Sequence, residues 1–96
     1  MLVAFSVTPI GTSNTSVADL VAPAVRVVRS SGLPNRTDAM FTTIEGSWDE
    51  VMDVVKRACD AVLEGCERVS LVIKADMRPG VTGQLDAKVQ AIEDRL

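Results

Sequence analysis

The sequence predicts an α+β fold in which strands and helices follow one another in the order βαββαβ, with a short helix after them. Three observations support this fold class. Runs of branched apolar residues, typical of strands, alternate with segments in which apolar residues recur at helical spacing. Ser-x-x-acidic sequences stand before the first two helical segments, and glycine or proline residues follow the segments. The 96 residues are enough for one domain, which we assign to residues 1–96.

The first strand and the first helix are predicted from the N-terminal third of the chain. LVAFSVT, residues 2–8, is a strand sequence that ends before a proline and Gly11. A polar loop follows, and Ser16 with Asp19 fits a capping box that starts a helix. Pro23 should kink this helix, because proline removes one backbone hydrogen bond. The apolar residues at helical spacing are Val17, Leu20, Val21, Ala24, Val25 and Val28.

Two strands and a second helix are predicted in the middle of the chain. Residues 35–40 are the weaker strand candidate, and residues 41–45 are the stronger one, which Gly46 ends. Ser47 and Glu50 form the second capping box. The helix that they start has an apolar stripe made of Val51, Val54, Val55, Ala58, Cys59 and Val62.

The last strand, residues 68–76, has the clearest pattern. One side of it carries Val69, Leu71, Ile73 and Ala75, and the other side carries Ser70, Val72, Lys74 and Asp76. After an RPG turn, a terminal helix is predicted from Leu85, Val89, Ile92 and Leu96. The complete order is that of a ferredoxin-like sandwich, in which both main helices cover one face of the sheet.

Composition excludes several classes of function. A net charge of −3 argues against nucleic-acid binding, which needs a basic face. The chain has no histidine, and Cys59 and Cys66 lack the spacing of a redox motif or a zinc site, so we expect free thiols and no metal. No apolar stretch is long enough to span a membrane, and the apolar N-terminal run has no basic flank. We therefore expect a cytoplasmic protein without membrane association.

The uncovered face of the predicted sheet favours self-association. It mixes apolar Leu2, Ala4 and Val72 with hydroxyl and charged side chains. A half-apolar open face on a small domain usually marks an interface between copies, and a chain of this length is only marginally stable alone. Polar groups at such an interface need partners, and a bound ligand can be one.

The segment FTTIEGSWDEV, residues 41–51, decides between a catalytic and a binding function. Asp49 and Glu50 fit the first turn of a helix, where the helix dipole favours negative charge. Trp48 is expected to pack across the neighbouring loop, the default use of an aromatic side chain. Glu45 lies near the end of a strand, where no structural role explains a carboxylate. Glu45 is therefore the candidate residue for binding a ligand.

Four motifs together resemble a known family. TPIGT (residues 8–12), SGLP (residues 31–34), MFTTIEGSWDEVMDVV and IKAD with the following RPG are similar to the small thiamine-binding proteins of the MTH1187/YkoF-like group. The resemblance covers nearly the whole chain. It implies a ferredoxin-like subunit that forms dimers or tetramers through the sheets. It also implies binding of thiamine or its hydroxymethylpyrimidine moiety as a ligand, without catalysis and without a cofactor.

The resemblance also implies the site residues. The family's threonine and glutamate fall on Thr42 and Glu45, its P-[LI]-G-T loop on residues 9–12, and its basic residue on Lys74. Strict alternation puts Thr43 on the face of Glu45 and Thr42 on the opposite face, so both threonines stay candidates. The candidate ligand-binding residues are Thr8, Gly11, Thr12, Thr42, Thr43, Glu45 and Lys74.

Such residues suit an aminopyrimidine. A carboxylate such as Glu45 can accept a hydrogen bond from the amine or a protonated ring nitrogen, and it can offset the thiazolium charge. The sequence departs from the family pattern at Asn35, where relatives carry an aromatic residue, and at Phe41, where they carry glycine. The first change removes a stacking partner, whereas Phe41 could supply one or narrow the pocket.

Other functions and roles compete with this hypothesis. The first is a regulatory or interaction module that binds another small molecule, since ferredoxin-like domains serve many functions. The second is an enzyme built on Glu45 and Lys74. The enzyme has less support, because the chain lacks a Ser-His or Cys-His pair and a glycine-rich phosphate motif.

Two of the candidate features also have purely structural alternatives. Lys74 could form an ion pair with Glu45 or Asp76 instead of binding a ligand. The loop before Ser16 could bind an anion or only cap the helix.

Overall fold

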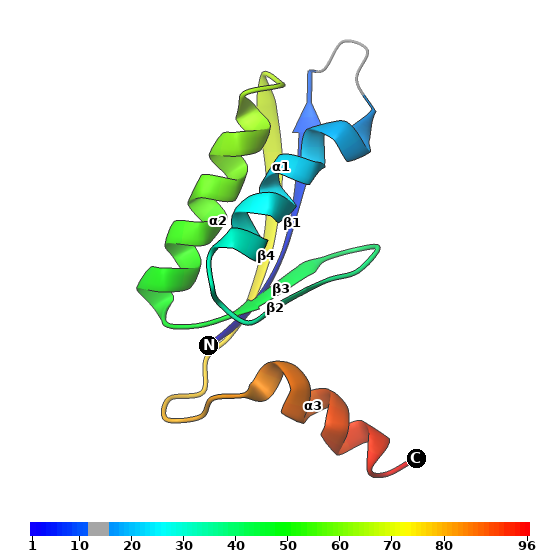
Figure 1. The fold of residues 1–96 in the computed structure, drawn as a ribbon, viewed down its shortest axis with the longest axis vertical. Helices are drawn as coiled ribbons and strands as arrows, with labels where there is room; N and C mark the ends of the chain where they lie inside the picture. The colour runs from blue at the N-terminus through cyan, green and yellow to red at the C-terminus, as the bar shows by residue number, and fades with distance from the viewer. Residues whose placement is uncertain (12–15) are drawn as a thin grey trace.

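The computed structural model describes residues 1–11 and 16–96, and it has the predicted α+β fold (Figure 1). The elements are β1 (Leu2–Ile10), α1 (Val17–Ser30), β2 (Asn35–Thr37), β3 (Thr42–Glu45), α2 (Trp48–Leu63), β4 (Arg68–Asp76) and α3 (Gln84–Glu93). The order βαββαβ with a terminal helix is confirmed.

The four strands form one antiparallel sheet in the order β2-β3-β1-β4. β1 and β4 pair along all nine residues of each strand, whereas β3 pairs only with Leu2–Phe5 of β1. β1 extends to Ile10, two residues beyond the predicted end. Pro9 is tolerated there because β3 no longer pairs with this part of β1, and a proline can occupy an open edge.

β2 is shorter than the predicted strand of residues 35–40, because Asp38 turns the chain. The Asp38 carboxylate accepts hydrogen bonds from the backbone N–H groups of Met40, at 2.8 Å, and Phe41, at 3.0 Å. Side chains of aspartate commonly bond their own backbone in this way and compete with strand pairing. These bonds, the one from Phe41 above all, lower the pKa of Asp38. The predicted strand therefore ends at Thr37.

α1 and α2 cover one face of the sheet and enclose the core (Figure 1). Ser16 caps α1 by accepting the N–H of Asp19, and the capping box of Ser47 and Glu50 at α2 is confirmed. α1 runs through Pro23 as one helix. The core consists almost entirely of branched residues and alanines: Val3, Phe5, Val7, Ala24, Val28, Ile44, Val51, Val54, Val55, Ala58 and Val62.

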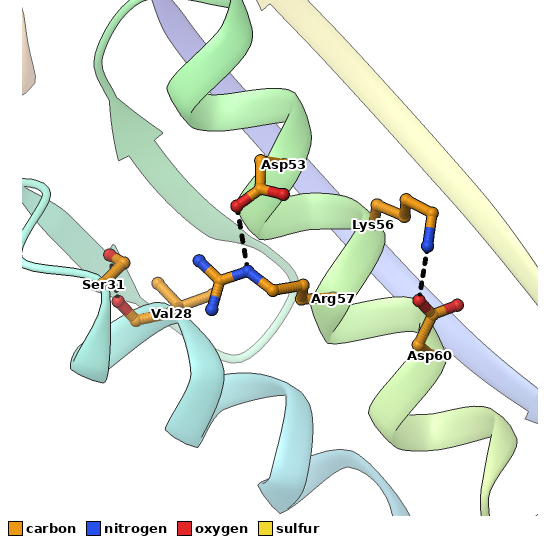
Figure 2. A network of polar contacts seen from close by, with 6 residues as sticks. All are labelled: Val28, Ser31, Asp53, Lys56, Arg57 and Asp60. Atoms are coloured by element: carbon orange, nitrogen blue, oxygen red, sulfur yellow. Dashed lines mark hydrogen bonds and ion pairs between the residues drawn. The ribbon is translucent and has the colours of Figure 1, made fainter.

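The outer side of α2 carries ion pairs along the helix (Figure 2). Arg57 donates to Asp53 at 2.9 Å, and Lys56 donates to Asp60 at 2.7 Å. Each partner is more than half exposed, so water screens the attraction and these pairs contribute little to stability. The stability of this layer therefore comes from the apolar side of the two helices.

α3 lies apart from this layer, beyond the end of the sheet at which the N-terminus lies (Figure 1). In the described chain none of its residues is buried, and Val89 and Ile92 are among its exposed apolar side chains. Its contacts with the rest of the molecule include contacts with β3. α3 is therefore held by something other than a hydrophobic core.

Candidate functional site

At one end of the sheet, the register brings three of the predicted site residues together on the face that α1 and α2 leave open. Ala4 lies opposite Thr43 on one side and opposite Lys74 on the other, so these three residues form one row across the sheet. Leu2 lies opposite Glu45 in the same way. Residues two apart on a strand share a face, so Thr43, Glu45 and Lys74 all belong to the open face.

Thr42 lies on the opposite, helix-covered face. Its residue is 7% exposed, and its hydroxyl group lies 3.3 Å from that of Thr37. The regular register of β1 with β3 leaves no bulge that could turn both threonines to one face. Thr43 is therefore the threonine that shares a face with Glu45.

The other predicted site residues lie toward the far end of β1. Thr8 lines a cavity of about 420 Å³ together with Thr42, and Gly11 has a φ of +76°. Thr12 lies outside the described residues. Thr8 is six residues along β1 from Leu2, the partner of Glu45, which corresponds to roughly 20 Å at about 3.4 Å per residue. The predicted residues therefore fall into two separate regions of the chain.

Glu45 has a structural partner that its sequence neighbourhood does not reveal. It is 8% exposed, and its Oε2 accepts the backbone N–H of Gln84 at 2.9 Å. Its Oε1 accepts the N–H of Leu85 at 3.4 Å. Gly83, the N-cap residue of α3, makes no side-chain cap bond, so Glu45 supplies the acceptor from another element. A carboxylate also suits the positive end of the helix dipole.

Two ion pairs complete the attachment of α3. Arg36 on β2 donates to Asp86 at 2.6 Å, and Lys88 donates to Asp76 at the end of β4. The hydrogen bond from Lys88 lowers the pKa of Asp76. Asp76 thus pairs with Lys88, whereas the sequence left Glu45 and Asp76 open as ion-pair partners of Lys74. Together with Glu45, these contacts connect α3 to three strands by polar groups.

A cavity of about 510 Å³ lies beside Glu45. One side comes from the start of α2, and the other comes from the chain between β4 and α3. The lining residues are Met1, Glu45, Gly46, Ser47, Trp48, Glu50, Met77, Arg78, Pro79, Gly80, Val81 and Thr82. The cavity therefore combines a carboxylate with an aromatic ring and several apolar side chains.

Trp48 differs from the expectation of a packing residue. It is 55% exposed and lines this cavity, although an aromatic ring that only packs would be largely buried. Its position at the first residue of α2, directly after the capping serine, directs it away from the core. The sequence feature that could have indicated a binding role is that Trp48 is the only tryptophan in the chain.

Another cavity, of about 350 Å³, lies on the open face around the row of Thr43 and Lys74, next to the cavity beside Glu45. Leu2, Ala4 and Ala75 supply its apolar part, and Asp76 and Lys88 border it. This cavity contains two of the predicted residues but not Glu45. The two cavities are neighbours, because Leu2 and Glu45 are paired in the sheet.

The thiols and carboxylates of residues 1–11 and 16–96 do not gather into a candidate metal site. Among residues 1–11 and 16–96 no cluster of three or more histidine, cysteine, aspartate or glutamate side chains could hold a metal ion. Cys59 and Cys66 are free thiols, and burial raises the pKa of Cys59. None of the helices in the described part of the chain is both long and apolar enough to cross a membrane.

Comparison with known proteins gives consistent matches along the chain. The family described as thiamine-binding protein matches residues 3–93. The chain is 58% identical to UPF0045 protein Mb1933 of Mycobacterium bovis, over 97% of this chain and 91% of that protein. It is 33% identical to a UPF0045 protein of Methanothermobacter thermautotrophicus, over 95% of this chain and 94% of that protein.

Two solved structures share the fold over most of their length. A domain of unknown function, DUF77, from Bacillus cereus has a TM-score of 0.87 and 38% sequence identity, over 98% of this chain and 90% of that one. Protein MJ1052 from Methanocaldococcus jannaschii has a TM-score of 0.85 and 31% identity, over 97% of this chain and 95% of that one. The fold described above is therefore the fold of these relatives.

Proposed function

Because the chain belongs to the thiamine-binding protein family, we propose that it binds thiamine or the hydroxymethylpyrimidine moiety of thiamine in the cavity beside Glu45. The protein binds this ligand without catalysis and serves to sequester or deliver it in the cytoplasm. The observation that carries the proposal is a carboxylate at the edge of an open, mostly apolar cavity that also contains the only tryptophan of the chain.

The size and lining of the cavity suit a small heteroaromatic molecule. Its volume of about 510 Å³ lies within the range of roughly 300–1,000 Å³ that is usual for small-molecule sites. Such sites combine apolar and aromatic walls with a few polar groups that fix the orientation of the ligand. Here Trp48 and Met77 supply the apolar contact, and Glu45 supplies the polar one.

Glu45 can bind the ligand while it caps α3. An ionised carboxylate offers about four lone-pair positions, and the backbone amides of Gln84 and Leu85 use two of them. The remaining positions can accept the amine of an aminopyrimidine and its protonated ring nitrogen. A hydrogen bond to a charged acceptor is shorter and stronger than a neutral one, so this contact fixes the orientation of the ring.

Trp48 is the second recognition element. Its exposed ring can stack on the pyrimidine or face the thiazolium, whose fixed charge is attracted to the face of an indole ring. The neighbouring carboxylate of Glu50 also borders the cavity and adds negative charge on the same side. In this proposal Glu45 binds the pyrimidine through hydrogen bonds, and Trp48 and Glu50 attract the positively charged thiazolium ring.

The assembly is part of the proposal. Leu71, Val72 and Ile73 on β4 are 42%, 55% and 37% exposed, so the last strand presents apolar side chains to solvent on both of its faces. Exposed apolar surface of this kind favours contact between copies of the chain. We therefore propose a homo-oligomer, a dimer or a tetramer, assembled through the sheets.

A ligand panel in isothermal calorimetry tests the binding function. Thiamine and hydroxymethylpyrimidine should bind, whereas a thiamine analogue with an oxo group in place of the amine should bind at least tenfold more weakly. The amine donates to Glu45, and loss of a charge-assisted hydrogen bond costs about 1.5–3 kcal/mol. Equal affinity for thiamine and the oxo analogue would contradict recognition of the amine, and absence of binding to either parent ligand would contradict the function.

A further inference from the structure

The turn that follows β4 fixes the position of Arg78. Its sequence is RPG, residues 78–80, and the backbone N–H of Val81 donates to the carbonyl of Arg78 at 3.2 Å. Gly80 has a φ of +80°. Proline at the second position and a glycine with positive φ at the third position are typical of a type II turn. The backbone of Arg78 is therefore held in place by a hydrogen-bonded turn at the wall of the Glu45 cavity.

Arg78 borders two adjoining hollows. It lines the cavity of about 510 Å³ beside Glu45, on the side opposite the start of α2. It also lines a smaller hollow, which shares Glu45 and Val81 with this cavity and reaches Lys88 of α3. Among the described residues that line the larger cavity, Arg78 has the only basic side chain. The cavity therefore has a positive group on one wall and carboxylates on the other side.

The guanidinium group of Arg78 is available to a ligand. The ion pairs found among residues 1–11 and 16–96 all involve other basic side chains. The two carboxylates of the cavity, by contrast, already have partners. Glu45 accepts backbone amides of α3, and Glu50 accepts the backbone N–H of Ser47 at 3.1 Å. The described contacts thus occupy the acidic side chains of the cavity and leave its basic side chain for an anionic group.

We propose that Arg78 binds the phosphate group of a phosphorylated thiamine, so that the site prefers thiamine monophosphate to thiamine. The pyrimidine lies at Glu45 and the thiazolium at Trp48, as proposed above. The hydroxyethyl arm of the thiazolium then carries the phosphate to the wall formed by residues 77–82. The inference names a narrower class of ligand for the same cavity, and it rests on the proposed function.

The chemistry of the guanidinium group suits this role. Its planar fork of N–H donors matches two oxygens of a phosphate, and such paired, charge-assisted hydrogen bonds are stronger than neutral ones. Glu45 and Glu50 repel a phosphate, but the positive thiazolium lies between them and the arginine in this arrangement. A contact of this kind is worth about tenfold or more in affinity. Thiamine monophosphate should therefore bind at least about tenfold more tightly than thiamine.

Calorimetric titration of both ligands into three proteins tests the role of Arg78. In the parent chain the ratio of the two affinities should be about ten or more. In Arg78→Gln the ratio should fall to about one while the affinity for thiamine stays unchanged, because thiamine has no group for this contact. A merely structural role of Arg78 would instead weaken both ligands alike.

Arg57→Gln is the matched control. It removes the same charge from the outer side of α2, where Arg57 pairs with Asp53 and does not line the cavity (Figure 2). It should keep the parental ratio. Inorganic phosphate is the control ligand, and it should displace thiamine monophosphate only at far higher concentration, because it lacks the rings that contact Glu45 and Trp48.

The outcomes separate this inference from the proposed function. Thiamine that binds as tightly as its monophosphate in the parent overturns the inference and leaves the thiamine site standing. A preference that persists in Arg78→Gln, or that Arg57→Gln loses equally, also overturns it. Displacement by inorganic phosphate at a similar concentration would show general anion binding and overturn it as well. If neither thiamine nor its monophosphate binds, the proposed function fails and the inference fails with it.

Discussion

On one face of the sheet, α1 and α2 bury branched apolar side chains, whereas α3 is attached by a buried carboxylate and two exposed ion pairs. The first attachment removes apolar surface from water, whereas the second replaces contacts with water by polar contacts within the protein, at little net gain. Segments with few buried apolar contacts open at lower free energy than the core of a protein. α3 should therefore detach locally while the sandwich remains folded.

The proposed ligand cavity lies between these two regions. Trp48 belongs to the start of α2, which is anchored in the core, and residues 77–82 belong to the chain that leads to α3. Glu45 contacts both the cavity and the first amides of α3. A ligand that contacts both walls binds the attached state of α3 and so stabilises it, because binding shifts an equilibrium toward the binding-competent state. We therefore predict that ligand binding orders α3 and the chain that leads to it, rather than α1 and α2, which are already held by the core.

The largest effect is expected from the core. Ile44→Ala should lower the free energy of unfolding by about 2–5 kcal/mol, because Ile44 is fully buried and its truncation leaves a cavity. The matched change Ile92→Ala on α3 should alter it by less than about 0.5 kcal/mol, because that side chain is exposed. Urea unfolding of both variants measures the difference. Equal destabilisation would show that α3 is packed as firmly as α1 and α2.

A smaller effect is expected at the cavity. Trp48→Ala should weaken thiamine binding about two- to thirtyfold, the size of a cation–π contact of roughly 0.5–2 kcal/mol. Its melting temperature should change little, because the ring is more than half exposed. Trp48→Phe should restore part of the affinity. A large drop in melting temperature with unchanged thiamine affinity would support the original hypothesis of a packing residue.

The smallest effect is expected when the pH is lowered and the ion pair between Lys88 and Asp76 is lost. The hydrogen bond from Lys88, aided by the charges of Lys74 and Arg78, lowers the pKa of Asp76 below its ordinary value of 3.8. A lowered pKa means that the pairing stabilises the folded chain above pH 3.8 and is lost as the pH falls through the lower, folded-state value. Amide chemical shifts of α3 should therefore stay constant from pH 7 to pH 5 and change only in stronger acid.

Asp76→Asn is the control for this titration. The variant lacks the ionised partner of Lys88 at every pH, so the part of the acid-induced change that belongs to this pair should be absent. A transition of α3 between pH 5 and pH 7 in the parent would contradict the role of Asp76.

Local patterns were sufficient to predict the sandwich. The capping box of Ser47 and Glu50 is a contact across three residues, and the apolar stripe of α2 repeats within one helix, so both can be read from neighbouring positions. The end of β2 could not be read in this way, because the turn depends on which backbone groups the Asp38 carboxylate accepts. β4 showed the expected alternation, yet both of its faces are largely exposed because it lies at the edge of the sheet.

The candidate site could be predicted only in part. Glu45 was identified because a carboxylate at a strand end lacked a local explanation, and its partners in α3 are 39 and 40 residues away. Alternation put Thr43 on the face of Glu45, but the sheet register was needed to exclude a bulge that would bring Thr42 to the same face. The cavity wall at residues 77–82 follows from the position of α3, which no sequence pattern specifies.

The central claim is that the Glu45 carboxylate binds the ligand, and calorimetric titration of thiamine into Glu45→Gln tests it most directly. The amide preserves the shape of the side chain but removes its charge and one acceptor, so affinity should fall about ten- to a hundredfold. Asp86→Asn is the matched control, because it weakens another contact of α3, the ion pair with Arg36, without changing any residue that lines the cavity. It should bind thiamine nearly as well as the parent. Parental affinity in Glu45→Gln, or an equal loss in both variants, would contradict direct recognition by Glu45.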